Sequence, residues 1–381
     1  GMIILAPLTT IIREEAYESA RVLLAPRSLA VLNLDAREVS GYVNGVTRSA
    51  SHLAAAAYRV TTSLPATAYQ FNPLHNPDAY SNDASLLIPV SALDESYLVL
   101  GWPGEGGEIF PGLRTDRRSF ITIVGSQAGT RVRVVPTTHV MAGVGLPALA
   151  PGDEFVVTLG PFETLNLEGD DLSTFGVTDF TGTRVEADGP IALFSGTECI
   201  GIGGCCCDHM EEQLFPRSSL GSAYVAVHAQ PRSTGFVEDD VFRVLALADG
   251  TTVTTSLAAP NDSFTLARGA MREIYTALDF TLTASAPVVV GQYLLGQEMT
   301  DTAIGDPAFL LTPPIEQHRD LYIFLVPSGY AANHVMLSVH SGTTPALDDA
   351  APAGCTRTPV GTLNGVSYDA LRCPISEGIH R

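Results

Sequence analysis

One phrase recurs three times along the chain and limits its fold more than any other feature. The phrase is a run of alternating residues, then a proline, then an apolar run, and it occupies residues 58–70, 183–194 and 280–292. Alternation with a period of two is typical of β-strands, and a short apolar run bounded by turn residues indicates a buried strand. The recurrence predicts a repeat-built fold in which neighbouring copies cover each other's apolar surface.

Two further phrases keep the same order around these copies. A short leucine-rich phrase ends in a proline at a nearly constant distance before a tyrosine, at Pro89 with Tyr97, Pro216 with Tyr224 and Pro313 with Tyr322. A strand pair with a glycine turn, which is a hairpin signature, matches residues 120–132 with 242–253. The repeated phrases define a module of about 100 residues.

The phrases divide the chain into four β modules that pack as one repeat-built unit. The first is partial and covers residues 1–84, two full modules cover 85–211 and 212–308, and a partial fourth covers 309–381. Six or seven short strands per module suit a tandem of β-sandwich-like modules. Closure of the repeated sheets into a propeller-like ring is the alternative.

Composition supports this all-β class. The chain has 35 glycines and 25 prolines, and its charged fraction of 16% is low, as expected for many turns between short strands. Helical signal is confined to residues 13–21 and 49–57, where the alanine run 54–57 favours a helix. We therefore expect one or two short helices in the first module.

The charge and the cysteine content limit which partners and which cellular compartment are expected for this chain. The net charge of -20 disfavours binding to nucleic acid or to anionic membranes, and no run of 18 apolar residues could insert into a membrane. Six cysteines in two clusters favour an oxidising compartment. The opening MIILAPL is too short and lacks the basic flank of a signal peptide. The cysteines therefore carry the prediction of an extracellular or cell-surface protein.

Each cysteine cluster predicts a disulfide. Cys199 and the run 205–207 flank a small glycine-rich loop that favours a bond between Cys199 and one of the three. Cys355 and Cys373 flank a turn-rich segment, and their pairing would stabilise the terminal module. A zinc site that recruits these cysteines with His209 is disfavoured, because structural zinc prefers paired Cys-x2-Cys knuckles and no second pair is present. No metal site is predicted.

The densest polar cluster follows the first cysteine cluster and is the main candidate ligand site. It comprises Asp208, His209, Glu212 and Gln213. Its members could bind a cation or a ligand with hydrogen-bond donors, but the favoured interpretation is that they cap a turn and satisfy backbone donors of adjacent strands. A cysteine nucleophile with His209 as its base would need an orienting group and an oxyanion site, which no motif supplies. We therefore predict no enzymatic activity.

Two weaker candidates lie elsewhere. Acidic residues that could supply oxygen ligands to calcium stand at Glu298, Asp301, Asp306 and the run 238–240. Their spacing is not that of an EF-hand, so we favour the interpretation that they lie in solvated loops. No cofactor is predicted, and calcium binding is the alternative. Trp102, the single tryptophan, lies in a glycine-rich loop on which a glycan or peptide could stack, or it covers a strand end.

The chain resembles the N-terminal domain family named after the IgGFc-binding protein, in its bacterial form. The resemblance rests on phrases spread over nearly the whole chain, at residues 69–74, 81–89, 207–214, 240–244 and 249–253. It implies a secreted or surface-exposed β-rich binding or adhesion module without agreed catalytic residues. It also implies that Cys199 pairs with Cys207. Three alternatives remain open for Cys205 and Cys206. They could form a disulfide with each other, stay reduced, or compete with Cys207 for Cys199.

These observations predict a non-enzymatic extracellular or cell-surface binding or adhesion module that presents loops on a β-repeat scaffold. The expected partner is a surface or matrix protein or a glycan, and nothing in the sequence supports carrying immunoglobulin binding over to this chain. One rival prediction is a hydrolase with its site at residues 207–213. The other is a structural spacer that only holds neighbouring domains apart.

Overall fold

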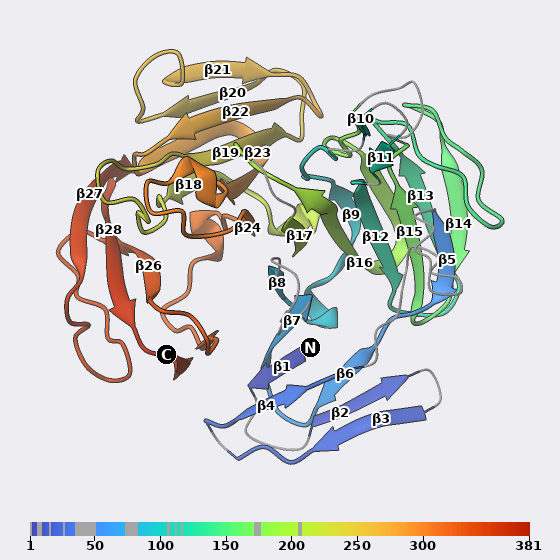
Figure 1. Cartoon of the computed structure of the whole chain (residues 1–381), viewed down its shortest axis with the longest axis horizontal. Coiled ribbons are helices and arrows are strands. Elements are labelled where there is room, and N and C mark those ends of the chain that lie inside the picture. The colour runs from blue at the N-terminus through green and yellow to red at the C-terminus, as the bar shows by residue number, and fades with distance from the viewer. Residues whose placement is uncertain are drawn as a thin grey trace. The chain divides into compact units, whose positions relative to one another are not determined.

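The computed structural model forms two compact units (Figure 1). The described residues are 2–5, 10–14, 17–25, 27–34, 51–72, 83–104, 107–110, 113–115, 117–170, 177–204 and 208–381. The first unit comprises Gly1–Gly201 and Cys206–Ser218, and the second comprises Ile202–Cys205 and Ser219–Arg381. Both units consist of antiparallel sheets, which confirms the all-β class.

The second module forms one curled sheet in the first unit. Its strands are β9 (Asp94–Leu98), β12 (Ser119–Gly125), β13 (Thr130–Val135), β14 (Phe155–Leu159), β15 (Glu163–Glu168), β16 (Arg184–Ile200) and β17 (Asp208–Gln213). The long strand β16 bends at Gly189-Pro190, so its first half pairs with β9 and β13 and its second half with β12 and β17. A hairpin, β10 (Gly107–Phe110) with β11 (Leu113–Thr115), lies between β9 and β12 in the chain.

The third module repeats this topology strand for strand in the second unit. Its strands are β18 (Gly221–Ala226), β19 (Asp240–Ala246), β20 (Thr251–Thr255), β21 (Ser263–Leu266), β22 (Met271–Thr276), β23 (Phe280–Leu294) and β24 (Ala308–Leu311). The long strand β23 pairs with β18 and β20 before Pro287 and with β19 and β24 after it. Figure 1 labels the strands of each curled sheet.

Within the described residues, the first module contains counterparts of these strands except the one that carries the tyrosine. Its strands are β1 (Met2–Leu5), β2 (Thr10–Glu14), β3 (Tyr17–Val22), β4 (Leu29–Leu32), β6 (Arg59–Thr62), β7 (Thr67–Asn72) and β8 (Asp83–Leu86). Here β6 and β7, separated around Pro65, occupy the two halves of the long strand. The predicted limits of the four modules stay a prediction, because the first two modules share one compact unit.

The repeated tyrosines have a structural role in two modules. The buried Tyr97 and Tyr224 hydroxyls donate to the carbonyls of Ile191 (2.6 Å) and Val288 (2.5 Å), each directly after the proline of the long strand. The hydroxyls also accept from the backbone N–H three residues earlier. Tyr322 shares only this second contact and is 53% exposed. The tyrosine therefore ties the first strand of a module to the bend of its long strand.

Replacing Tyr224 by phenylalanine is expected to destabilise the second unit. The change leaves the Val288 carbonyl without its side-chain donor in a buried site, which costs about 1–3 kcal/mol of unfolding free energy. Native-state hydrogen exchange of β18 and β23 measures the loss. Tyr322→Phe is the matched control, since exposed substitutions usually stay within about 0.5 kcal/mol. Equal effects of the two substitutions would contradict the assigned role.

The core of the third module lies inside the curl of its sheet. It is formed by buried side chains from six strands, including Tyr224, Phe242, Val253, Ile274 and Phe280. Because strands from both halves of the sheet contribute, the curled sheet covers its own core much as the two sheets of a sandwich do.

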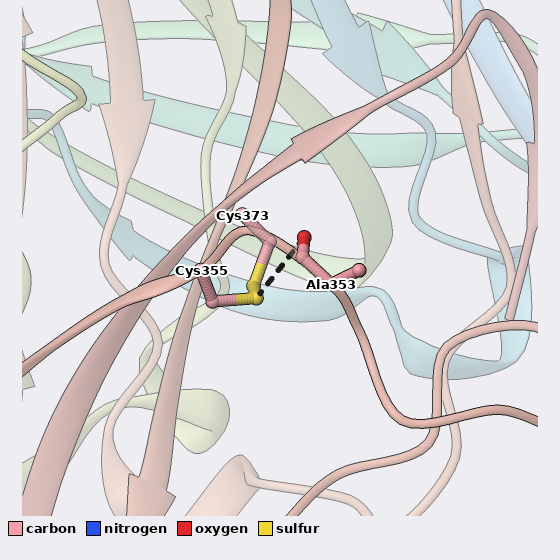
Figure 2. Close-up of a disulfide and its surroundings, with 3 residues drawn as sticks. All are labelled: Ala353, Cys355 and Cys373. Atoms are coloured by element: carbon pink, nitrogen blue, oxygen red, sulfur yellow. Dashed lines mark hydrogen bonds between the residues drawn. A yellow bond between two sulfur atoms is a disulfide. The ribbon is translucent and has the colours of Figure 1, made fainter.

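The C-terminal part adds two small sheets to the second unit. These are the pair β25 (Phe324–Val326) with β29 (Gly378–His380), and the sheet of β26 (Asn333–His340), β28 (Val366–Ile375) and β27 (Thr356–Leu363). Side chains of β27 and β28 pack against Ala223 and Val225 of β18. Cys355 and Cys373 form the disulfide that the sequence predicts (Figure 2). This bond ties the start of β27 to β28.

The two predicted helices are wrong. Residues 13–21 fall mainly on β2 and β3, and β5 (His52–Ala55) pairs with β15 instead of forming the first turns of a helix. Pairing to a sheet overrides the weak helix preference of alanine. Helices of the described residues are three-residue 3-10 turns: η1 (Val90–Ala92), η2 (Arg217–Ser219), η3 (Gln297–Met299) and η4 (Ile315–Gln317). Within this part of the chain, none could cross a membrane.

Candidate functional site

The polar cluster that the sequence nominates lies on β17 of the first unit. This strand pairs with the second half of β16, so that Gln213 lies opposite Phe194 and Glu212 opposite Ser195. Asp208 and Gln213 are buried, whereas His209 and Glu212 are half-buried. The cluster is therefore part of a sheet and not of a turn after the cysteine loop.

Side chains of β8 bind the backbone of β17. The Asp83 carboxylate accepts from the Glu211 N–H (2.9 Å), and the Ser85 hydroxyl donates to the Glu211 carbonyl (3.0 Å) and accepts from the Gln213 N–H (3.1 Å). The Gln213 side chain in turn accepts from the Ile88 N–H (2.8 Å). The predicted satisfaction of backbone donors thus holds for Gln213, which joins β17 to the segment that follows β8.

Burial shifts the pKa values of the titratable side chains on β17. It raises the pKa of Glu211 to about 7, and together with the charges of Asp83 and Glu211 it raises the pKa of Glu212 well above its usual value. Burial also lowers the pKa of His209 to about 4. The His209 ring stacks on Phe120 with centroids 5.9 Å apart. Near neutral pH the His209 imidazole on β17 is therefore neutral, and the Glu211 and Glu212 carboxyls are at least partly protonated.

Glu211→Gln is expected to remove a pH dependence from the stability of the first unit. The folded carboxyl keeps its proton up to about pH 7, whereas the unfolded chain releases it near 4.5. Between these values the folded state binds more protons, so its stability falls as pH rises and levels off above pH 7. The wild type should lose on the order of 1–3 kcal/mol between pH 5 and pH 8 relative to the variant.

Urea unfolding at the two pH values, followed by Trp102 fluorescence, measures this difference. Trp102 is the single tryptophan and lies in the first unit, so its signal reports that unit. Glutamine keeps the acceptor for the Gln70 side-chain amide, which lies 2.7 Å from Glu211 Oε1. Parallel pH profiles of wild type and variant would show that Glu211 does not titrate as proposed.

The other nominated residues do not join the β17 cluster as a ligand site. Trp102 is buried, with 9% of its surface exposed, and its carbonyl accepts from the Thr197 hydroxyl (3.1 Å), so its ring offers little surface for stacking. Cys199 is disulfide-bonded, and its predicted partner Cys207 lies outside the described residues with Cys205 and Cys206. Among the residues that the structure describes, no group of three or more His, Cys, Asp or Glu side chains could hold a metal ion.

A second candidate surface, which the sequence does not single out, lies on two loops of the second unit. We name residues 229–239 and 295–306 the loop platform. Four large apolar side chains stand exposed on it: Phe236 (51%), Val237 (49%), Met299 (39%) and Ile304 (61%). The one signal in the sequence is the apolar pair Phe236-Val237 within a polar, glycine-containing loop. Exposed apolar groups on adjoining loops mark interaction sites more often than scattered ones do.

Carboxylates hold the two loops of the platform together. Asp301 accepts from the N–H groups of Thr234 (2.7 Å) and Gly235 (2.6 Å), directly before Phe236. Arg232 donates to the Leu295 carbonyl (2.8 Å), and its carbonyl accepts from the Thr302 hydroxyl (2.9 Å). The apolar side chains are therefore displayed from a hydrogen-bonded frame.

The charges of this frame are stabilised by the same contacts. Burial opposes ionisation of Glu238, but the N–H groups of Arg232 and Ser233 and the Arg232 side chain outweigh it and lower the pKa of Glu238 to about 2. The N–H groups of Thr234 and Gly235 lower the pKa of Asp301. Both carboxylates, which are among the calcium candidates, thus accept from protein donors. Calcium binding itself stays a prediction.

The fold defines an all-β repeat protein with exposed apolar side chains on two loops of its second unit. The family model described as IgGFc binding protein matches residues 83–381, and the chain belongs to this family. A human protein named IgGFc-binding protein is 28% identical over 243 residues, which are 63% of this chain and 4% of the human protein. The chain thus spans a small fraction of that relative's length. No solved structure matches this chain.

Proposed function

We propose that this chain is a non-enzymatic binding module of a secreted or cell-surface protein and that the loop platform contacts a protein partner. Membership of the IgGFc binding protein family supports a binding role. The observation that carries the proposal is the exposure of Phe236, Val237 and Ile304 on loops fixed by Asp301. A preformed apolar surface binds without the cost of ordering its loops.

The charges on the platform indicate the kind of partner. Glu298 and Asp306 are exposed on the same loops as Met299 and Ile304, and the chain carries a net charge of -20. Apolar contacts within an acidic surface suit a partner that presents an apolar patch with arginine or lysine at its edge. Association should accordingly slow as the salt concentration rises.

Binding of the purified chain to immobilised proteins tests the proposal. The probes are the human IgG Fc fragment, which the name of the human relative suggests, and a panel of secreted glycoproteins. For any protein that binds, Phe236→Ser combined with Ile304→Ser should weaken binding at least about tenfold, as expected for loss of apolar anchors. Val144→Ser is the matched control, because Val144 is 86% exposed but lies in the first unit. Equal binding by both variants would place the contact elsewhere.

The two rivals predict different outcomes. A spacer would bind no probe above background. A hydrolase with its site near β17 would turn over ester or peptide substrates and lose this activity in the His209→Gln, Glu212→Gln double variant. Burial lowers the pKa of His209 to about 4, which makes it a weak general base, and β17 is paired along β16, so the binding role is the better supported function.

A further inference from the structure

A buried histidine connects the two ends of the first platform loop, residues 229–239. His228 lies directly before this loop, and only 2% of its surface is exposed. Its ring Nδ1 lies 2.6 Å from the carbonyl oxygen of Ala229, and its Nε2 lies 2.8 Å from the carbonyl oxygen of Glu238. The ring therefore bridges the start and the end of the loop that displays Phe236.

Both of these contacts require the histidine to donate. A backbone carbonyl oxygen only accepts hydrogen bonds, and a neutral imidazole has one N–H group and one acceptor nitrogen. In either neutral tautomer, one ring nitrogen would turn its lone pair toward a carbonyl oxygen 2.6 or 2.8 Å away. The imidazolium, which donates from both nitrogens, is the form that satisfies both contacts.

Asp240, the first residue of β19, supplies the opposite charge. Its Oδ1 lies 3.5 Å from His228 Nε2, and both side chains are 2% exposed. Its Oδ2 accepts from the Ala229 N–H (2.7 Å) and from the Gln292 side-chain amide (2.6 Å). Burial raises the pKa of Asp240, whereas the charge of His228 and these two donors oppose that shift. A protein interior can hold a charge that is paired and hydrogen-bonded in this way.

Four other charged groups surround the histidine, and they form two ion pairs with each other: Arg372 with Asp279, and Arg232 with Glu238. The first pair contacts the backbone N–H and carbonyl of His228. The second pair lies within the loop. Among the ion pairs of the described residues, the His228 ring takes part in one, the pair with Asp240.

We propose that His228 is held as an imidazolium that closes the first platform loop and makes the stability of the closed loop depend on pH. The open loop can release the proton that the closed loop holds, so the closed loop is favoured as pH falls and loses stability as pH rises. A solvated imidazole releases its proton at about pH 6.5, so the loss begins near this pH. The consequence for binding rests on the proposed function of the platform, whereas the charge and its effect on the loop do not.

Nitrogen NMR of the histidine side chains tests the charge on the wild-type protein. At pH 7, where a solvated imidazole is mostly neutral, both ring nitrogens of His228 should carry a directly bonded hydrogen. His209 supplies the contrast in the same spectrum, because burial lowers the pKa of His209 to about 4 and its ring should carry one such hydrogen. A single N–H on the His228 ring at pH 7 overturns the proposal.

Hydrogen exchange of residues 232–237 tests the loop. Protection factors, which divide out the intrinsic pH dependence of exchange, should fall about tenfold in the wild type from pH 6 to pH 8, because opening releases one proton. In His228→Gln they should be lower at pH 6 and constant with pH, since glutamine does not titrate. His334→Gln is the matched control, because His334 is exposed on β26. Equal pH profiles of wild type and His228→Gln overturn the proposal.

Binding at pH 6 separates this proposal from the proposed function. His228→Gln should weaken any probe that contacts the platform, because the partner then has to order the loop. His334→Gln should bind as the wild type does. A chain that binds no probe, yet shows both ring hydrogens and the pH-dependent loop, supports the imidazolium and contradicts the proposed function alone. Equal binding by His228→Gln and wild type, with the loop opened in the variant, overturns the part of His228 in binding.

Discussion

Replacing Asp279 by alanine is expected to lower the unfolding free energy of the second unit by about 3–5 kcal/mol, the usual cost of leaving a buried charge without its partner. Asp279 pairs with Arg372, and the side chains of both residues are less than a tenth exposed. Arg372 also donates to the His228 carbonyl (2.8 Å). Asp279 accepts from the N–H of the same histidine (2.9 Å). Removal of the carboxylate would leave the guanidinium buried beside carbonyls and the Thr358 hydroxyl, with no opposite charge.

Hydrogen exchange followed by mass spectrometry measures this change. Exchange should accelerate in β18 and β28, while the urea transition seen by Trp102 fluorescence in the first unit should not move. Glu154→Ala is the control, since its partner Arg133 lies on the surface and exposed pairs contribute little. Leucine at 279 combined with methionine at 372 should recover part of the loss, because an apolar pair leaves no buried charge. Equal effects of Asp279→Ala and Glu154→Ala would contradict the argument.

The repeat was predictable because its signals are local in sequence. Alternation and the proline at the bend mark each long strand, and the spacing to Tyr97 and Tyr224 marks where a module begins. These positions are set by backbone geometry: a buried hydroxyl must reach the carbonyl after the bend. The sequence does not show that the long strand serves both halves of one curled sheet. That depends on pairing between segments far apart in the chain.

The predicted helices are wrong where contacts between residues far apart in the chain determine the secondary structure. The alanine run after His52 favours a helix in isolation, yet β5 gains hydrogen bonds from β15, more than 100 residues later in the chain. Trp102 illustrates the same limit for the site. Its glycine-rich flank leaves an exposed stacking loop and a covered strand end as alternatives, and the burial of the ring is seen only in the structure.

The candidate site was only partly predictable. The polar residues on β17 are recognisable as a cluster, but their role depends on β8, whose Asp83 and Ser85 carry no signal of that contact. The loop platform has no periodic pattern, and apart from the apolar pair Phe236-Val237 in a polar loop the sequence does not separate its exposed side chains from core residues. Their exposure is seen only in the structure, where Asp301 accepts hydrogen bonds that join the first loop to the second.

Phe242→Ala is expected to cost about 3–5 kcal/mol in the second unit, which is usual for removal of a fully buried ring. Phe242 is completely buried on β19 and meets Phe280 of β23 edge to face, with ring centroids 4.9 Å apart. Truncation would leave a cavity where β19 and the long strand meet, and the sheet cannot close it without breaking its pairing. Hydrogen exchange of β19 and β23 measures the loss.

Phe236→Ala is the matched control for this substitution, with the same chemistry in the same unit. Its ring is half exposed on the loop platform, so its removal should leave exchange in β19 and β23 unchanged while it weakens partner binding. The two phenylalanines therefore separate stability from recognition. If both substitutions destabilised the unit equally, Phe236 would belong to the core, and the platform would lose its main contact residue.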